Sequence, residues 1–225
     1  LAGDDAVSAV VLTGAGRAFS AGGDLDMLDR MGDAGRADPG GPARDENRAF
    51  MGRFYRLYLT VRDLPQPTIA AVNGHAIGAG CCVALACDIR IAAAEAKLGL
   101  NFARLGIHPG MAATWTLPRL VGPAHAAELL YTGKLIDGPE AALIGMVNRS
   151  LPRDVVVGEA QSVARAIAES SPLAVRGTKR SLAESHTSSL SDQLDREAQE
   201  QALCYETHDL AEGLTAVREK RAPAF

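Results

Sequence analysis

The stretch Asn73-Gly-His-Ala-Ile-Gly-Ala-Gly80 lies between two apolar runs, Thr68–Val72 before it and 81–86 after it. An apolar run that ends in Asn-Gly predicts a buried strand and a turn, and the run after Gly80 predicts a short helix starting near Gly80 or Cys81. Glycines in such a turn let a ligand approach the backbone, and the helix N-terminus adds a positive partial charge at the same place. The stretch therefore predicts a backbone site for an oxygen that carries negative charge.

A second glycine-rich turn, Ala18-Phe-Ser-Ala-Gly-Gly-Asp-Leu25, follows the apolar run 7–13. A thioester or ketone that reacts at the carbon next to its carbonyl passes through an enolate-like state, whose charge collects on the carbonyl oxygen. Two backbone N–H groups at that oxygen stabilise this state, and loss of one such donor costs about 10²–10³ in rate. We interpret the two turns as a pair that aims two N–H groups at one carbonyl oxygen.

The order of strand and helix patterns along the chain predicts an α/β protein. Apolar runs at 7–13, Thr68–Val72 and 88–92 predict strands, and the first is expected to be buried on both faces, as in a parallel sheet covered by helices. A helix between successive strands predicts right-handed crossover units. No internal repeat is evident in the sequence itself.

The C-terminal part differs in composition, because strand patterns become scarce after Pro152 and the chain turns polar and charged. We therefore expect a core of strands and helices at 1–169 and a helical part at 170–225. The helices are expected at 155–169, 172–185, 190–207 and 209–221.

Residues 32–44 are rich in Gly and Pro without periodic apolar positions, which predicts a mobile surface loop placed where it could cover a ligand. Asp45 is expected to cap the helix that follows. Two further helices are expected at 110–120 and 122–131, the first of them distorted by its internal proline. Asp24 is expected to cap a helix after the first glycine-rich turn.

Composition excludes several classes of protein. Only 4% of the 225 residues are aromatic and the formal net charge is −4, which argues against nucleic acid as a main ligand. No apolar run is long enough to cross a bilayer, so we expect no membrane partner and a cytoplasmic location. The four cysteines lack the spacing of a zinc site, and we expect no metal and no bound cofactor. The chain enters its first strand almost at once and without Met, so we expect an N-terminal segment to be missing.

Five motifs follow one another along the chain: A-F-S-A-G-G-D-L, A-V-N-G-H-A-I-G-A-G-C, C-D-I-R-I-A, G-I-H-P-G-M and a closing E-K-R-x-P-x-F. Together they resemble the crotonase superfamily of enoyl-CoA hydratases and isomerases, over essentially the whole chain. This resemblance implies a spiral of ββα units, a C-terminal helical trimerisation region and a homotrimer or hexamer. It also implies acyl-CoA thioesters as the small-molecule substrates or ligands.

The resemblance also implies roles for individual residues. The oxyanion amides would be those of Gly23 and Ala79, where family members often have Gly in place of Ala79. Backbone groups of Ala21, Gly23 and Leu25 match the adenine-binding stretch. Lys220 matches a lysine that reaches a CoA phosphate in relatives, often from a neighbouring subunit.

The chain departs from the family pattern at its acid/base positions. Cys82 and Phe102 stand where hydratases of the superfamily have their two glutamates. Aspartates that other members use around Gly110 and Met111 are also missing. Loss of one positioned acid/base group costs about 10²–10⁴ in rate, so we do not expect efficient hydration by the usual route.

Other readings of these residues stay open at this point. Cys82 could be a nucleophile or acid/base group at a helix N-terminus, but a buried core thiol is favoured. His108 could face the acyl group or stabilise a surface turn. Phe102 could make the pocket drier or simply pack in the core. The protein could accordingly be an acyl-CoA enzyme, a non-catalytic acyl-CoA carrier or sensor, or a structural subunit of a mixed assembly.

Overall fold

The computed structural model describes residues 2–225, and Leu1, which belongs to the expectation about the start of the chain, lies outside them. The strands are β1 (Val10–Thr13), β2 (Ala18–Ser20), β3 (Thr68–Val72), β4 (His75–Ile77), β5 (Ile89–Ala93), β6 (Lys97–Gly99), β7 (Ile136–Asp137) and β8 (Arg149–Leu151). The helices are α1 (Leu25–Ala37), α2 (Pro42–Tyr58), α3 (Ala79–Ala86), α4 (Ala113–Thr132), α5 (Gly138–Leu143), α6 (Val156–Ala168), α7 (Pro172–Ser185), α8 (Leu190–Tyr205) and α9 (His208–Glu219). Short 3₁₀ helices are η1 (Thr60–Asp63), η2 (Asn101–Leu105) and η3 (Arg153–Val155).

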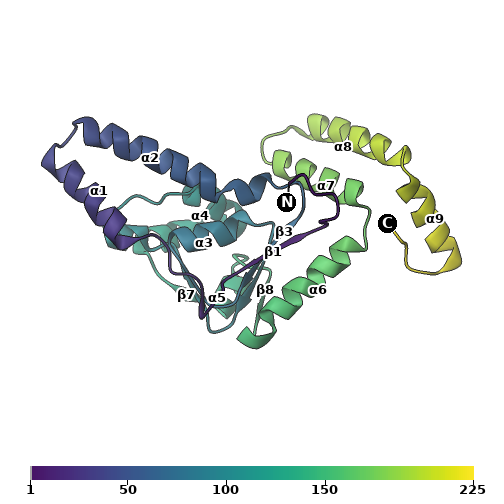
Figure 1. The fold of residues 1–225 in the computed structure, drawn as a ribbon, viewed down its shortest axis with the longest axis horizontal. Coiled ribbons are helices and arrows are strands. Elements are labelled where there is room, and N and C mark those ends of the chain that lie inside the picture. Colours follow the sequence, from purple (N-terminus) through teal and green to yellow (C-terminus); the bar gives the residue numbers. More distant parts are fainter. Residues whose placement is uncertain (1) are drawn as a thin grey trace. The chain divides into compact units, whose positions relative to one another are not determined.

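A repeated order of two strands and then helix builds the fold (Figure 1). In the first three units, the first strand joins one sheet, which β8 completes in the order β1-β3-β5-β8, and the second strand joins another, which β7 completes in the order β2-β4-β6-β7. In the last part of the spiral, α5 lies between β7 and β8 along the chain. Neighbours β2 and β4, β4 and β6, and β5 and β8 are parallel, whereas β7 pairs antiparallel with β6. This arrangement confirms the α/β prediction and is the spiral of ββα units that the resemblance implied.

The best-buried strand is β3, whose five residues are all buried. Fully buried side chains include Ile69 of β3 itself, and also Ile91, Leu98 and Leu117. In contrast, β1 is only partly buried, because it is the edge strand of its sheet. The prediction that this first strand is buried on both faces was therefore wrong.

The predicted mobile loop at 32–44 was also wrong, because α1 and α2 form a helical hairpin there and leave only residues 38–41 between them (Figure 1). The Asn47 side-chain amide donates to the Met31 carbonyl at 3.1 Å and ties the two helices together. Gly41 occupies the N-cap position of α2, with Pro42 at its start. Asp45 therefore lies inside the first turn and does not cap the helix.

Two further expectations can be compared directly. Asp24 caps α1, since its carboxylate accepts from the Met27 N–H at 3.1 Å, as predicted. The helices expected at 110–120 and 122–131 are two helical stretches of α4, which begins at Ala113 and breaks at Gly122 (φ 77°, ψ 163°), as the two-helix pattern predicted. Glycine allows this positive φ, so the chain changes direction there. The distortion expected at Pro118 is not found, because the backbone there is helical.

The chain divides into two compact units. One comprises residues 12–63 and 70–159, and the other comprises the residues up to 11, 64–69 and 160–225. The first unit holds both glycine-rich turns, and the second holds α7, α8 and α9. The division of the chain at 169/170 stays a prediction.

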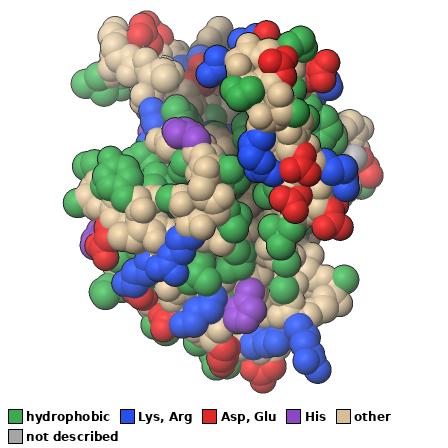
Figure 2. Space-filling view, turned by 90° about the vertical axis from the view of Figure 1, so that its left-hand side faces the viewer, with side chains coloured by type: hydrophobic (Ala, Val, Ile, Leu, Met, Phe, Trp, Pro, Cys, Tyr) green, Lys and Arg blue, Asp and Glu red, His purple; other side chains and the backbone are tan. Residues whose placement is uncertain are grey.

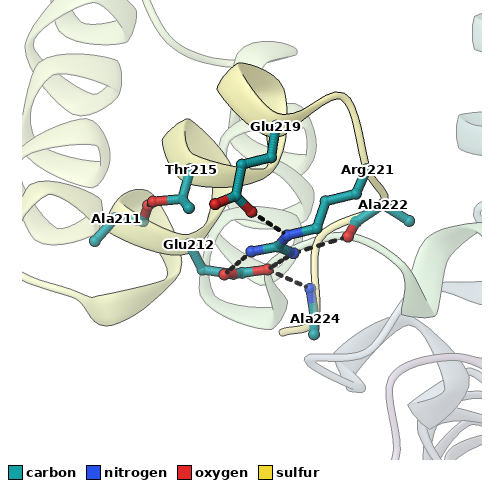
Figure 3. A network of polar contacts seen from close by, with 7 residues as sticks. All are labelled: Ala211, Glu212, Thr215, Glu219, Arg221, Ala222 and Ala224. Atoms are coloured by element: carbon teal, nitrogen blue, oxygen red, sulfur yellow. Dashed lines mark hydrogen bonds and ion pairs between the residues drawn. The ribbon is translucent and has the colours of Figure 1, made fainter.

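Polar contacts fold the last residues back onto α9 (Figure 3). The Arg221 guanidinium bonds to both carboxylate oxygens of Glu212, at 2.6 and 2.9 Å, and to Glu219 at 2.7 Å. Glu212 also accepts from the Ala224 N–H at 2.8 Å. The intervening Lys220 has a left-handed backbone (φ 56°), which turns the chain at the end of the helix.

Charges of both signs are interspersed with apolar side chains on the face drawn in Figure 2. Within residues 2–225, none of the helices combines the length and the apolar character needed to cross a bilayer.

Candidate active site

Parallel pairing of β2 with β4 brings the two glycine-rich turns together, because Ala18 is paired with His75 and Ser20 with Ala76. Gly22 has a left-handed φ of 103°, and a β-carbon there would lie 2.6 Å from the Ile77 carbonyl oxygen and 3.8 Å from the Ala79 nitrogen. No side chain fits in that space, so glycine is required.

The N–H groups of Gly23 and Ala79 lie on these adjoining turns. Within residues 2–225, neither N–H donates a hydrogen bond to another protein group. Ala79 is the first residue of α3, after the Gly78 N-cap (φ 53°, ψ −119°), so its N–H belongs to the positive end of the helix. Both N–H groups are therefore free of protein acceptors in the described part of the chain, and their role as oxyanion donors stays a prediction.

Both turns open into a cavity of about 370 Å³ within the first unit. Its walls come from α1, α2, the two turns, η2 and the segment before α4. The lining residues are Ala21, Gly22, Gly23, Leu25, Met27, Leu28, Met51, Phe54, Tyr55, Ile77, Gly78, Ala79, Asn101, Phe102, Leu105, Ile107, His108 and Met111. The structure thus brings six of the predicted site residues to one pocket, and neither Cys82 nor Lys220 is among its walls.

Cys82 is a core residue, only 3% exposed. Its thiol approaches the Gly110 carbonyl oxygen, with 3.7 Å between sulfur and oxygen. Burial, and next the neighbouring Cys81, raise the pKa of Cys82 well above its usual range, and burial raises that of Cys81 to about 12. Both thiols are therefore protonated at neutral pH, which makes them poor nucleophiles and bases.

Phe102 forms an apolar wall of the cavity from η2 and is 9% exposed. Asn101, the residue before it, brings a polar group to the same region, because a β-carbon on Gly78 would lie 3.4 Å from its side-chain oxygen.

His108 lines the pocket and is exposed. Its Nδ1 lies 2.8 Å from the Pro109 carbonyl oxygen, an atom that can only accept, so Nδ1 carries the proton in this contact. In the neutral ring, Nε2 is then the unprotonated nitrogen. Among the residues that line the pocket, His108 therefore has a ring nitrogen, Nε2, that can act as a proton acceptor. His75, in contrast, accepts from the Lys97 N–H at 2.9 Å and has a local structural role.

Tyr55, on α2, is a site residue that the sequence analysis missed. It lines the cavity, and burial raises the pKa of its hydroxyl, as does the nearby Cys82. The signal in the sequence was the spacing of four between Met51 and Tyr55, which puts both on one helix face.

Lys220 lies in the other compact unit, exposed at the end of α9. Among residues 2–225 there is also no cluster of three or more His, Cys, Asp or Glu side chains able to hold a metal ion.

A ββα spiral whose glycine-rich turns meet at an apolar pocket defines the crotonase class of α/β proteins. The model of the family described as enoyl-CoA hydratase/isomerase matches residues 1–225. A crotonyl-CoA hydratase of Syntrophomonas wolfei is 37% identical over 223 residues, which are 99% of this chain and 82% of that protein. A 1,2-epoxyphenylacetyl-CoA isomerase of Escherichia coli is 38% identical, with the same shares covered. The crystal structure of an enoyl-CoA hydratase from Bacillus anthracis matches with a TM-score of 0.88 at 38% identity, covering 99% of this chain and 83% of the other. The chain belongs to the enoyl-CoA hydratase/isomerase family.

Proposed function

We propose that this protein binds acyl-CoA thioesters and stabilises a thioester enolate with the N–H groups of Gly23 and Ala79. The observation that carries the proposal is that these two donors, neither used within residues 2–225, lie on adjoining turns of one pocket. One of them begins a helix, whose partial charge adds to the stabilisation of an oxyanion. By the family resemblance, Ala21, Gly23 and Leu25 hold the adenine of CoA, and Lys220 holds a phosphate.

We further propose that the enzyme moves a proton and does not add water efficiently. No Asp or Glu is among the lining residues, whereas His108 presents an unprotonated Nε2. Nε2 takes the proton from the carbon next to the thioester, the electron pair of that C–H bond moves to the carbonyl oxygen, and the imidazolium returns the proton to the acyl chain. The relatives named as a hydratase and an isomerase of CoA esters support a CoA thioester as the substrate.

A second candidate is a non-catalytic acyl-CoA carrier or sensor. The absence of carboxylates from the lining residues favours it, because binding needs only the amides and the apolar walls. A third candidate, a structural subunit of a mixed assembly, requires no ligand at all.

Assembly as a homotrimer or hexamer is also proposed. Uncovered apolar side chains on the C-terminal helices support it, since they would be buried in an assembly. These include Leu182, Leu190, Leu194, Leu203, Tyr205 and Val217. Light scattering that finds a monomer would contradict it. The cytoplasmic location and the absence of nucleic-acid and membrane partners stay predictions.

Calorimetry and hydrogen exchange separate the candidates. We expect butyryl-CoA to bind and to take up deuterium from D₂O next to the thioester. The Ala79→Pro variant should lower this exchange by about 10²–10³, because proline is accepted at the first position of a helix but has no N–H. Ala79→Gly, which keeps the N–H, is the matched control. Binding without exchange would favour the carrier, and no binding of any CoA ester would leave only the structural subunit.

The acid/base part of the proposal needs a hydration assay with crotonyl-CoA and longer enoyl-CoA esters. The wild-type protein is compared with the Cys82→Glu/Phe102→Glu variant. We expect little hydration by the wild-type protein, and rapid hydration would contradict the view that the two glutamates are needed.

A further inference from the structure

The Tyr55 hydroxyl projects from α2 to the backbone of Gly110. A β-carbon on Gly110 would lie 2.7 Å from Cζ and 3.0 Å from Cε1 of the Tyr55 ring, and closer still to the hydroxyl oxygen. The phenol therefore occupies the space that a side chain at position 110 would fill. Cys82 contacts the carbonyl of the same Gly110 from the first turn of α3, the helix that begins at Ala79. This places the phenol near the N-terminal turn of the helix that carries one proposed oxyanion donor.

No protein group within residues 2–225 forms a hydrogen bond with the Tyr55 hydroxyl. The neighbouring walls of the pocket are apolar and include Met51, Phe54, Phe102 and Met111. A hydroxyl that faces apolar walls gains free energy when a ligand oxygen accepts its hydrogen bond. Because burial raises the pKa of Tyr55, the hydroxyl keeps its proton at neutral pH and can donate.

The other polar groups of the pocket are placed for different tasks. The N–H groups of Gly23 and Ala79 are directed to the thioester carbonyl under the proposed function. The side-chain oxygen of Asn101 lies beside Gly78 at the same turn, and His108 has its Nδ1 at the Pro109 carbonyl. Tyr55 alone among these comes from the helical hairpin that covers the pocket.

We propose that Tyr55 determines specificity by donating a hydrogen bond to an oxygen carried on the acyl chain itself, so that the pocket selects oxygenated acyl-CoA thioesters over hydrocarbon ones. The inference rests on the proposed function, because it needs an acyl-CoA in this pocket. It goes beyond that function by naming the substrate class and the residue that recognises it.

The test is a set of calorimetric affinities for butyryl-CoA and for its oxygenated analogues of equal chain length: both enantiomers of 3-hydroxybutyryl-CoA, acetoacetyl-CoA and 4-hydroxybutyryl-CoA. In the wild-type protein, we expect at least one analogue to bind about threefold to tenfold more tightly than butyryl-CoA, the range of one hydrogen bond. In Tyr55→Phe, which keeps the ring, this ratio should fall to about one. Tyr58→Phe is the matched control, since Tyr58 lies on the same helix, is 51% exposed and does not line the pocket, and the ratio should persist in it.

Each result is informative. A wild-type ratio near one for every analogue, or a ratio that persists in Tyr55→Phe, would overturn the inference and leave the proposed function intact. A loss of the ratio in Tyr58→Phe as well would assign the effect to the helix and would also overturn it. Failure of butyryl-CoA and all analogues to bind the wild-type protein would overturn the proposed function, and the inference with it.

Discussion

Gly80 lies so close to Ser20 that a β-carbon on Gly80 would overlap the Ser20 side chain. The same β-carbon would also lie 2.8 Å from the Ser20 carbonyl oxygen, a backbone atom that cannot rotate away. Ser20 ends β2 and Gly80 lies in the first turn of α3, so this contact sets the distance between the two glycine-rich turns. The spacing of the proposed oxyanion donors therefore depends on the absence of a β-carbon at Gly80.

The Gly80→Ala variant should separate the turns. We expect a loss of stability of about 1–3 kcal/mol, the usual cost of overpacking, and a weaker affinity for butyryl-CoA. Gly35→Ala is the control, because Gly35 lies in α1 with nothing within 4 Å of a new β-carbon. Alanine there should stabilise the protein by about 0.5–1 kcal/mol. Urea unfolding and calorimetry measure both effects, and equal behaviour of the two variants would contradict the argument.

Replacement of Cys82 by alanine tests whether its thiol takes part in the reaction. Because Cys82 is buried, has a raised pKa and does not line the pocket, we expect the exchange rate of butyryl-CoA to stay within about threefold. Stability should fall by about 1 kcal/mol through the lost packing. In the native protein at pH 8, iodoacetamide should leave Cys81 and Cys82 unmodified, as read by mass spectrometry. A loss of rate above tenfold would restore Cys82 as an acid/base candidate.

The sequence predicts the glycine-rich turns well because a turn at the end of a strand is specified by the glycines of the turn itself. Strand periodicity does not reveal the repeated ββα unit, which the family resemblance alone implied, since β2, β4 and β6 have three residues each and are too short for a periodic pattern. Gly32 and Gly35 likewise hide α1, whose hairpin with α2 is held by tertiary contacts such as that of Asn47 with Met31. Local propensity is overruled there by packing.

The residues of the pocket could likewise be predicted only in part from the sequence. Gly23, Ala79, Phe102 and His108 could be placed because motifs carry them, and all four line the cavity. Tyr55 could not be placed in the pocket in this way, because its contact with Gly110 depends on the packing of α2 against the segment before α4, which is distant in sequence.

Lys220 should bind a phosphate of CoA, and substitution tests this role separately from the acyl pocket. Lys220→Gln is expected to weaken butyryl-CoA binding by about threefold to tenfold at low salt, with a smaller effect at high salt, because an exposed charge is screened. Binding of butyryl-pantetheine, which has no nucleotide phosphates, should not change. Arg218→Gln, two residues away on the exposed end of α9, is the matched control. Equal losses for both ligands would show that Lys220 acts on the fold and not on a phosphate.

The contacts of Glu212 with Arg221 and Ala224 should make stability depend on pH (Figure 3). The Arg221 hydrogen bonds, and then that of the Ala224 N–H, lower the pKa of Glu212 from 4.5 to about 2. A carboxyl group whose pKa is lower in the folded state stabilises the fold above its unfolded pKa, and this contribution is lost as pH falls from 4.5 toward 2. Glu212→Gln should therefore be less stable than the wild-type protein at pH 7, and the difference should shrink across that range.

Urea unfolding at pH 7, 4.5 and 3 measures this difference, with Glu206→Gln as the control, because no ion pair of the Glu206 side chain is found within residues 2–225. The control should follow the wild-type protein at each pH. Since Arg221 holds the chain on both sides of the Lys220 turn, Glu212→Gln should also loosen that turn and lower the affinity for butyryl-CoA but not for butyryl-pantetheine. A pH-independent difference would mean that Glu212 contributes through packing and not through its charge.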